Sequence, residues 1–352
     1  MRQQFKALQA CKGLAALFIA CGHFLGFTGK FTVAYILMCD FFFICSGMTT
    51  GMSIRYYESK EQTYIEHMFT SKIKKVWIPY IIICTIWLAI IYIRKSSEEI
   101  NLIYIFLVIM LLQCMGFMSD GQEILNASPI GISWYLSVDF WGGTIYFYII
   151  YLLRKRKDIA MLIEIVVALL CGNILINTSP NYMDVHYAKL MVGNLTLTYA
   201  LIRALLGYSI GLLISELYTS ITKKKDTWNK YAVQFTFIEL FCIVILFKLY
   251  GSVNYCRMND FAFPILGAII VLVMCIEQGY VCKILKTKWF SFLGQYSFYF
   301  YLTHMVAREI VVRSMGERMR YLPIYLVWTM ILSVMLNKCC KCISKVLDVP
   351  IR

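Results

Sequence analysis

The chain has 352 residues, of which 60% are hydrophobic and 15% charged, and its mean hydropathy is +0.67. Soluble domains are about half apolar and a quarter charged, so this composition excludes a soluble two-domain protein, a disordered chain and a collagen-like chain. The 34 basic and 20 acidic residues leave an excess positive charge that lies mostly between apolar blocks, where it orients a membrane protein and meets anionic lipid headgroups rather than nucleic acid.

Apolar blocks of about 20 residues recur along the chain, and each is long enough to cross a bilayer as a helix. They predict an all-α integral membrane protein, a single transmembrane domain over residues 1–352. The ten predicted spans are 8–27, 33–53, 73–93, 133–153, 159–176, 195–216, 232–250, 261–281, 291–312 and 321–343. We expect the first span to be retained rather than cleaved as a signal peptide, because many spans follow it.

An eleventh apolar block, 101–118, is assigned from the charges around it. The basic clusters fall on one side of the membrane only if this block does not cross: 72–75, 154–157, 223–225, 283–288 and the tail from Lys338 to Arg352. We therefore predict ten spans with both termini in the cytoplasm. The block 101–118 is then re-entrant, or packed along the bundle at its outer face.

The 14 cysteines do not predict a disulfide framework. Most lie within or at the edges of apolar blocks, where free cysteine acts as a small hydrophobic residue. The cluster Cys339, Cys340 and Cys342 has no nearby histidine or fourth thiol, so we expect no zinc site there and no metal cofactor elsewhere.

Ionisable residues inside apolar blocks are costly unless they are paired or face a polar cavity, so each is a functional candidate. In the first span Lys12 precedes His23 by 11 residues, which places both on one helix face about 16 Å apart. A neutral imidazole at His23 suits a general base. A histidine satisfied by a hydrogen bond between helices fits the same spacing.

The second and third spans add a carboxylate and a cationic collar. Asp40 precedes the run FFFICSG and needs a partner, while the Ser46-Gly47 pair in that run lets another helix approach closely. Lys72 and Lys75 belong to a lysine collar just before Pro79. Such a collar suits phosphate groups, which lysine binds as a point charge, and it equally suits lipid headgroups.

Three later spans carry further polar candidates. Asp139, within SWYLSVDFW, is a second buried carboxylate. Arg203 is followed at four-residue spacing by Gly207 and Gly211, which form one small-residue face. His304 closes the sequence FLGQYSFYFYLTH in the ninth span.

Together these elements resemble acyltransferase family 3, the multispan membrane proteins that O-acetylate cell-surface glycans. Six short motifs match in order along most of the chain: Lys12 with His23; Asp40, Phe42, Phe43, Ser46 and Gly47; Lys72, Lys75 and Pro79; Trp134, Ser137 and Asp139; Arg203, Gly207 and Gly211; and Leu293, Gly294, Ser297, Tyr301, Leu302 and His304. Two kinds of departure stand out: lysine replaces the family's arginine at 12, 72 and 75, and aspartate replaces its glutamate at 139.

The resemblance implies an acyl-CoA donor, acetyl-CoA, and an acceptor hydroxyl on an envelope glycan or its lipid-linked precursor at a bacterial plasma membrane. It implies a coenzyme A phosphate site at Lys12, Lys72 and Lys75, and His23 as general base or acyl carrier. Asp139 or Asp40 would then orient a histidine, Arg203 would stabilise charge on the thioester carbonyl, and His304 would serve the acceptor.

Two other functions remain open. A transporter or flippase of a lipid-linked sugar shares ten spans and buried charges, but it requires no acyl-CoA. A structural partner of a glycan-synthesis complex that has lost activity is compatible with the lysine replacements.

Overall fold

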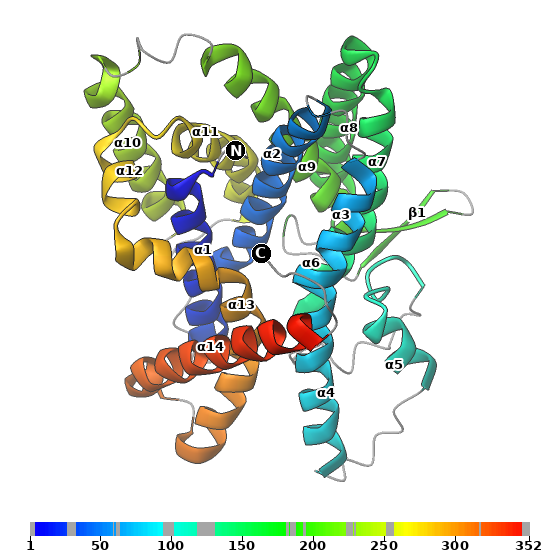
Figure 1. Cartoon of the computed structure of the whole chain (residues 1–352), viewed down its shortest axis with the longest axis vertical. Coiled ribbons are helices and arrows are strands. Elements are labelled where there is room, and N and C mark those ends of the chain that lie inside the picture. Colours follow the sequence, from blue (N-terminus) through cyan, green and yellow to red (C-terminus); the bar gives the residue numbers. More distant parts are fainter. Residues whose placement is uncertain are drawn as a thin grey trace.

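The structure is a computed structural model that describes residues 4–26, 33–58, 60, 64–93, 102–117, 131–180, 183, 188–192, 195–222, 228, 230–250, 257–316 and 318–346. Within these residues the chain forms a helical bundle with one two-stranded antiparallel sheet (Figure 1). The predicted all-α membrane fold is confirmed. The basic cluster 223–225 lies outside the described residues.

The elements of the first half are α1 (Lys6–Leu25), η2 (Val33–Ile36), α2 (Leu37–Glu58), α3 (Tyr64–Lys72), the π-helical turn η3 (Ile73–Trp77), α4 (Ile78–Ile93), α5 (Leu102–Ile109), η5 (Gly131–Ser133), α6 (Trp134–Ser137), the π-helical turn η6 (Val138–Gly142), α7 (Gly143–Leu153) and α8 (Lys157–Thr178). The second half contains β1 (Lys189–Val192), β2 (Leu195–Thr198), α9 (Tyr199–Thr222), α10 (Ala232–Tyr250), η8 (Arg257–Ala262), α11 (Phe263–Ile276), α12 (Tyr280–Leu285), α13 (Lys288–Met315), η9 (Met319–Tyr321) and α14 (Leu322–Val346).

Nine of the ten predicted spans coincide with helices that, among the described residues, are long and apolar enough to cross a membrane. The remaining predicted span, 291–312, lies in α13, which is not one of these nine helices although its 28 residues reach about 42 Å. This helix packs between α1 and α14 and buries His304 and Arg308. Polar side chains are tolerated in a membrane helix that is covered by other helices.

Two span boundaries differ from the sequence prediction for local reasons. The predicted span 195–216 begins with strand β2, which pairs with β1, and its helix starts at Tyr199. The predicted span 261–281 ends early, because Glu277 adopts a left-handed conformation (φ 59°) that terminates α11.

Contacts at both ends of helix pairs give the directions of the spans. In α3 and α7, Tyr64 packs against Tyr151 at 5.8 Å between ring centroids, while Lys72 pairs with Asp139, so these helices are antiparallel. The chain between α4 and α6 therefore returns to the end of the bundle that it left. Helix α5 has only eight residues, about 12 Å, and does not act as a span. The described part of the predicted block 101–118, residues 102–117, is thus packed against the bundle rather than crossing it.

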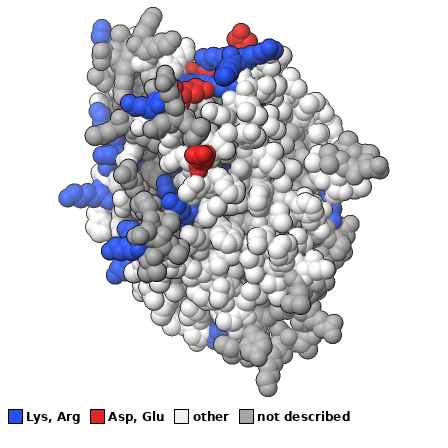
Figure 2. Space-filling model, turned by 45° about the vertical axis from the view of Figure 1, so that its right-hand side comes forward, with Lys and Arg blue, Asp and Glu red and all other residues white. Residues whose placement is uncertain are grey.

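Apolar side chains cover the outside of the peripheral helices. Exposed residues of this kind include Leu162 and Leu169 of α8 and Phe237, Phe241 and Phe247 of α10. Figure 2 shows a broad face without charged side chains, with Lys and Arg gathered at its upper end and along its left side. This distribution is expected of a surface in contact with lipid chains.

Candidate active site

Two histidines from distant parts of the chain meet inside the bundle. His23 of α1 and His304 of α13 stack with their ring centroids 5.2 Å apart and an interplanar angle of 30°. The two helices are parallel and touch at glycines ten residues earlier, where a Cβ on Gly13 would lie only 2.7 Å from the backbone nitrogen of Gly294. The close glycine contact therefore brings the two imidazoles to the same depth.

The surroundings of His304 fix its tautomer. Its side chain is fully buried, and Nδ1 lies 2.5 Å from the carbonyl oxygen of Tyr301. A carbonyl oxygen only accepts, so Nδ1 carries the proton and Nε2 of the neutral ring holds a lone pair. Nε2 has no hydrogen-bond partner among the described residues. His304 thus has one ring nitrogen anchored and, within the described part of the chain, one without a partner, whereas its neighbour His23 is half-buried and also stacks on Tyr35 at 4.8 Å.

Asp40 and Arg203 form a fully buried ion pair between α2 and α9. Arg203 Nε lies 3.1 Å from Oδ1 and Nη2 lies 2.5 Å from Oδ2 of the carboxylate, a two-pronged contact. Nη2 also lies 3.4 Å from the carbonyl oxygen of Ile36, and the guanidinium sits 5.0 Å from the ring of Trp134. The charge of Arg203 is therefore matched by Asp40 within the bundle.

Small residues make this pair possible, as the sequence pattern predicts. A Cβ on Gly47 of α2 would lie 2.9 Å from Cα of Gly211 of α9, so the two backbones are in contact. The same helices meet at both ends, through Asp40 with Arg203 and through Arg55 with Glu216, which makes them parallel. Helices this close hold the ion pair rigidly.

Asp139 has Lys72 as its charged partner. The ammonium nitrogen lies 3.6 Å from Oδ2 of Asp139 and also donates to the backbone carbonyl of that residue. The other carboxylate oxygen accepts hydrogen bonds from Ser46 Oγ at 3.1 Å and from Tyr208 OH at 3.2 Å. Asp139 belongs to the π-helical turn η6 and Lys72 directly precedes the π-helical turn η3. Such turns occur often at functional sites.

The remaining predicted residues lie apart from these pairs. Lys12 is half-buried on α1, and Lys75 is exposed. Of the three predicted phosphate ligands, Lys72 is thus paired with Asp139, whereas Lys75, three residues later, is exposed. Asp40 binds Arg203, and Asp139 binds Lys72, Ser46 and Tyr208, so a histidine-orienting role for either carboxylate stays a prediction.

An aromatic chain that sequence reasoning missed joins the separate groups. Tyr135 packs on Phe43 at 4.8 Å and on Tyr301 at 5.9 Å, and the ring of Tyr301 lies 5.7 Å from that of His304. Phe43 in turn contacts Trp134, the residue beneath Arg203, at 6.1 Å. Tyr135 lies within the motif SWYLSVDFW, but a tyrosine in an apolar run carries no signal of its own.

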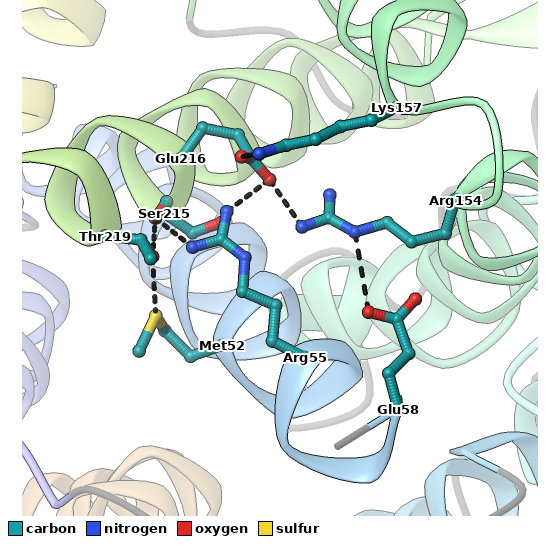
Figure 3. Close-up of polar contacts among 8 residues, drawn as sticks. All are labelled: Met52, Arg55, Glu58, Arg154, Lys157, Ser215, Glu216 and Thr219. Carbon is teal, nitrogen blue, oxygen red and sulfur yellow. Dashed lines mark hydrogen bonds and ion pairs between the residues drawn. The ribbon is translucent and has the colours of Figure 1, made fainter. Parts of the chain in front are cut away.

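A second missed cluster lies where α2, α9 and the turn between α7 and α8 meet (Figure 3). Arg55, Arg154 and Lys157 converge on the carboxylate of Glu216, with Arg154 Nη2 at 2.6 Å and Lys157 Nζ at 3.0 Å. Arg154 also faces Glu58 at 3.9 Å. The basic run at 154–157 marks this end of the bundle in the sequence, but nothing there indicates Glu216 as its partner.

The profile of acyltransferase family 3, an acyltransferase domain, matches residues 5–338 and so includes every residue of the site above. The chain belongs to acyltransferase family 3. No curated relative and no solved structure gives a significant match. Membership of the family makes this protein a membrane acyltransferase.

Proposed function

We propose that this membrane acyltransferase moves an acetyl group from acetyl-CoA to a hydroxyl of an envelope glycan or of its lipid-linked precursor. The observation that carries the proposal is the stacked pair of His23 and His304, in which Nε2 of His304 has no partner among the residues that the structure describes. A buried neutral imidazole with one nitrogen anchored is the arrangement that a general base requires.

In the proposed step the proton of the acceptor hydroxyl passes to Nε2 of His304 while the hydroxyl oxygen attacks the thioester carbonyl. The carbon–sulfur bond breaks, and the leaving thiolate takes the proton from the imidazolium to become free coenzyme A. His304 thereby returns to its neutral form. His23, the half-buried member of the pair, would meet the thioester donor.

The donor would enter from the basic end of the bundle. Phe5, just before α1, packs on Tyr218 at 5.4 Å, close to the cluster of Glu216 with Arg154 and Lys157. The start of α1 therefore lies at the same end as the basic turn, which the positive-inside rule assigns to the cytoplasm. Lys12 and Lys75 are our candidate ligands for the coenzyme A phosphates, with Lys72 acting through Asp139.

The test is transfer of labelled acetyl groups from acetyl-CoA to deacetylated envelope glycan by the purified protein in nanodiscs. We expect His23→Gln and His304→Gln each to lower the rate by about 10²–10⁴, the usual contribution of a general base. The matched control is His67→Gln, because His67 is an exposed histidine of α3 whose ring packs on Tyr57 at 4.7 Å, outside the histidine pair.

Rates within threefold of the unmodified protein for both site variants would refute the assignment of the histidine pair. Translocation of a lipid-linked sugar without consumption of acetyl-CoA would identify a flippase and refute the proposed reaction itself.

A further inference from the structure

The turn that follows α5 is folded into the bundle and held from three sides. Side chains from three different elements bind its backbone: Trp141 Nε1 donates to the carbonyl of Met110 at 2.8 Å, Ser137 Oγ accepts from the amide of Cys114 at 3.0 Å, and Thr198 Oγ1 donates to the carbonyl of Cys114 at 2.7 Å. The turn contains Leu111 at φ 56°, a strained conformation for leucine. The surrounding structure thus holds this turn in one shape.

Gln113, within this turn, has one amide atom satisfied and one not. Its side chain is 3% exposed, and Nε2 donates to the carbonyl oxygen of Ser133 at 3.4 Å and to Oγ of Ser133 at 3.1 Å. Because the carbonyl only accepts, the nitrogen must face Ser133 and Oε1 must point away from it. Ser133 Oγ donates on to Tyr80 OH at 3.3 Å, which donates to the carbonyl of Val108 at 2.9 Å. Both hydroxyl protons of this chain are therefore used within it.

Oε1 of Gln113 is left as a buried acceptor, and within the described residues it has no donor. The same holds for Nε2 of His304. Tyr301 links the two groups, because its hydroxyl donates to the carbonyl of Ile132 at 2.6 Å, next to Ser133, and its ring lies 5.7 Å from His304. Buried acceptors without donors are rare in proteins, and a ligand that brings hydroxyl groups supplies what both lack.

We propose that the acceptor is a polyol bound between α13 and the turn after α5, with one hydroxyl held by Oε1 of Gln113 and a second, reacting hydroxyl at Nε2 of His304. This inference rests on the proposed function and adds a residue that selects the acceptor. The turn lies by the starts of α6 and α9, at the end of the bundle opposite the Glu216 cluster. That end faces the cell exterior if the basic end is cytoplasmic, and envelope glycans lie there.

The experiment compares two probe acceptors, a hexose derivative with several hydroxyls and a monohydroxy alcohol of similar size, in the same acetyl-transfer assay. Gln113→Leu should raise the KM for the sugar about fivefold to tenfold, the loss of one hydrogen bond to a buried group, and leave the KM for the alcohol unchanged. Affinity for acetyl-CoA and hydrolysis of the thioester without acceptor should not change. Gln295→Leu, an exposed position on α13, is the control.

If Gln113→Leu fails to fold, Gln113→Asn takes its place, because it keeps the amide but retracts it by one methylene. It should raise the KM for the sugar by a smaller factor and leave the KM for the alcohol unchanged. An unchanged KM for the sugar would mean that water, not substrate, satisfies Oε1, and would overturn the inference. An equal rise for both probes would reduce Gln113 to a structural role and would overturn it too. In either case, loss of acetyl transfer in His304→Gln would still support the proposed reaction. Absence of acetyl transfer by the wild-type protein would instead refute the proposed reaction itself.

Discussion

Removing one partner of the buried pair between Asp40 and Arg203 should cost at least as much stability as removing both. The side chains are 0% and 4% exposed for Arg203 and Asp40, so Asp40→Asn leaves a guanidinium without its counter-charge inside the bundle. Breaking such a pair typically costs about 3–5 kcal/mol, whereas replacing both partners by apolar groups is often close to neutral. We therefore expect Asp40→Asn and Arg203→Met each to lose about 3–5 kcal/mol of unfolding free energy, and the double variant to lose no more than either.

The assay is reversible unfolding in mixed micelles, run as a double-mutant cycle with thermal melting as a second measure. The expected coupling energy between Asp40 and Arg203 is at least about 3 kcal/mol, the smaller of the two single losses. Arg313→Gln is the control, because Arg313 pairs with Glu309 one turn earlier on α13 and is 57% exposed, so we expect a loss of about 0.5 kcal/mol. Losses that simply add, or single losses below about 1 kcal/mol, would show that the two residues do not form one electrostatic unit.

Packing and charge lead to three more expected outcomes. Gly47→Val places side-chain atoms against the backbone of α9 and should destabilise the protein by more than about 2 kcal/mol, whereas Gly172→Ala, which has nothing within 4 Å, should be neutral or slightly stabilising in the same melts. Lys12→Gln should weaken acetyl-CoA binding about tenfold at low ionic strength and less at high ionic strength. If the variant binds acetyl-CoA as tightly as the wild type at both ionic strengths, Lys12 does not belong to the donor site. With exposed native cysteines replaced, a cysteine at Met191 should react with membrane-impermeant reagent in intact cells, and a cysteine at Lys155 should react only after the cells are permeabilised. The opposite result would reverse the topology, and labelling of both in intact cells would refute their placement at opposite ends of the bundle.

The polar network at the basic end shows why charge patterns alone say little about contacts. The sequence displays the basic run at 154–157, and the positive-inside rule makes use of it, but three cations meet one carboxylate only because α2, α8 and α9 converge there (Figure 3). Glu216 lies in an apolar helix far along the chain, and no spacing rule connects it with Arg55. Its role in joining these helices comes entirely from the tertiary structure.

Hydropathy and helix periodicity are local properties, and they determined the local features of this protein. The apolar blocks located the spans, the balance of basic residues separated 101–118 from them, and the small residues Gly47, Gly207 and Gly211 marked the faces where helices touch. His23, Asp40, Asp139, Arg203 and His304 were each visible as a single polar residue in an apolar block, because the desolvation cost makes such a residue conspicuous. The family motifs rest on the same local residues.

Partnership between these residues was decided only by the tertiary structure. Asp40 and Arg203 are 163 residues apart, and Lys72 and Asp139 are 67 apart, so no period or spacing relates them. Which helices become neighbours depends on packing over the whole bundle, and glycine contacts then set the depth at which side chains meet. Gln113 was invisible in the sequence for the same reason: an uncharged amide in an apolar block acquires meaning only when its neighbours satisfy one of its atoms and leave the other without a donor.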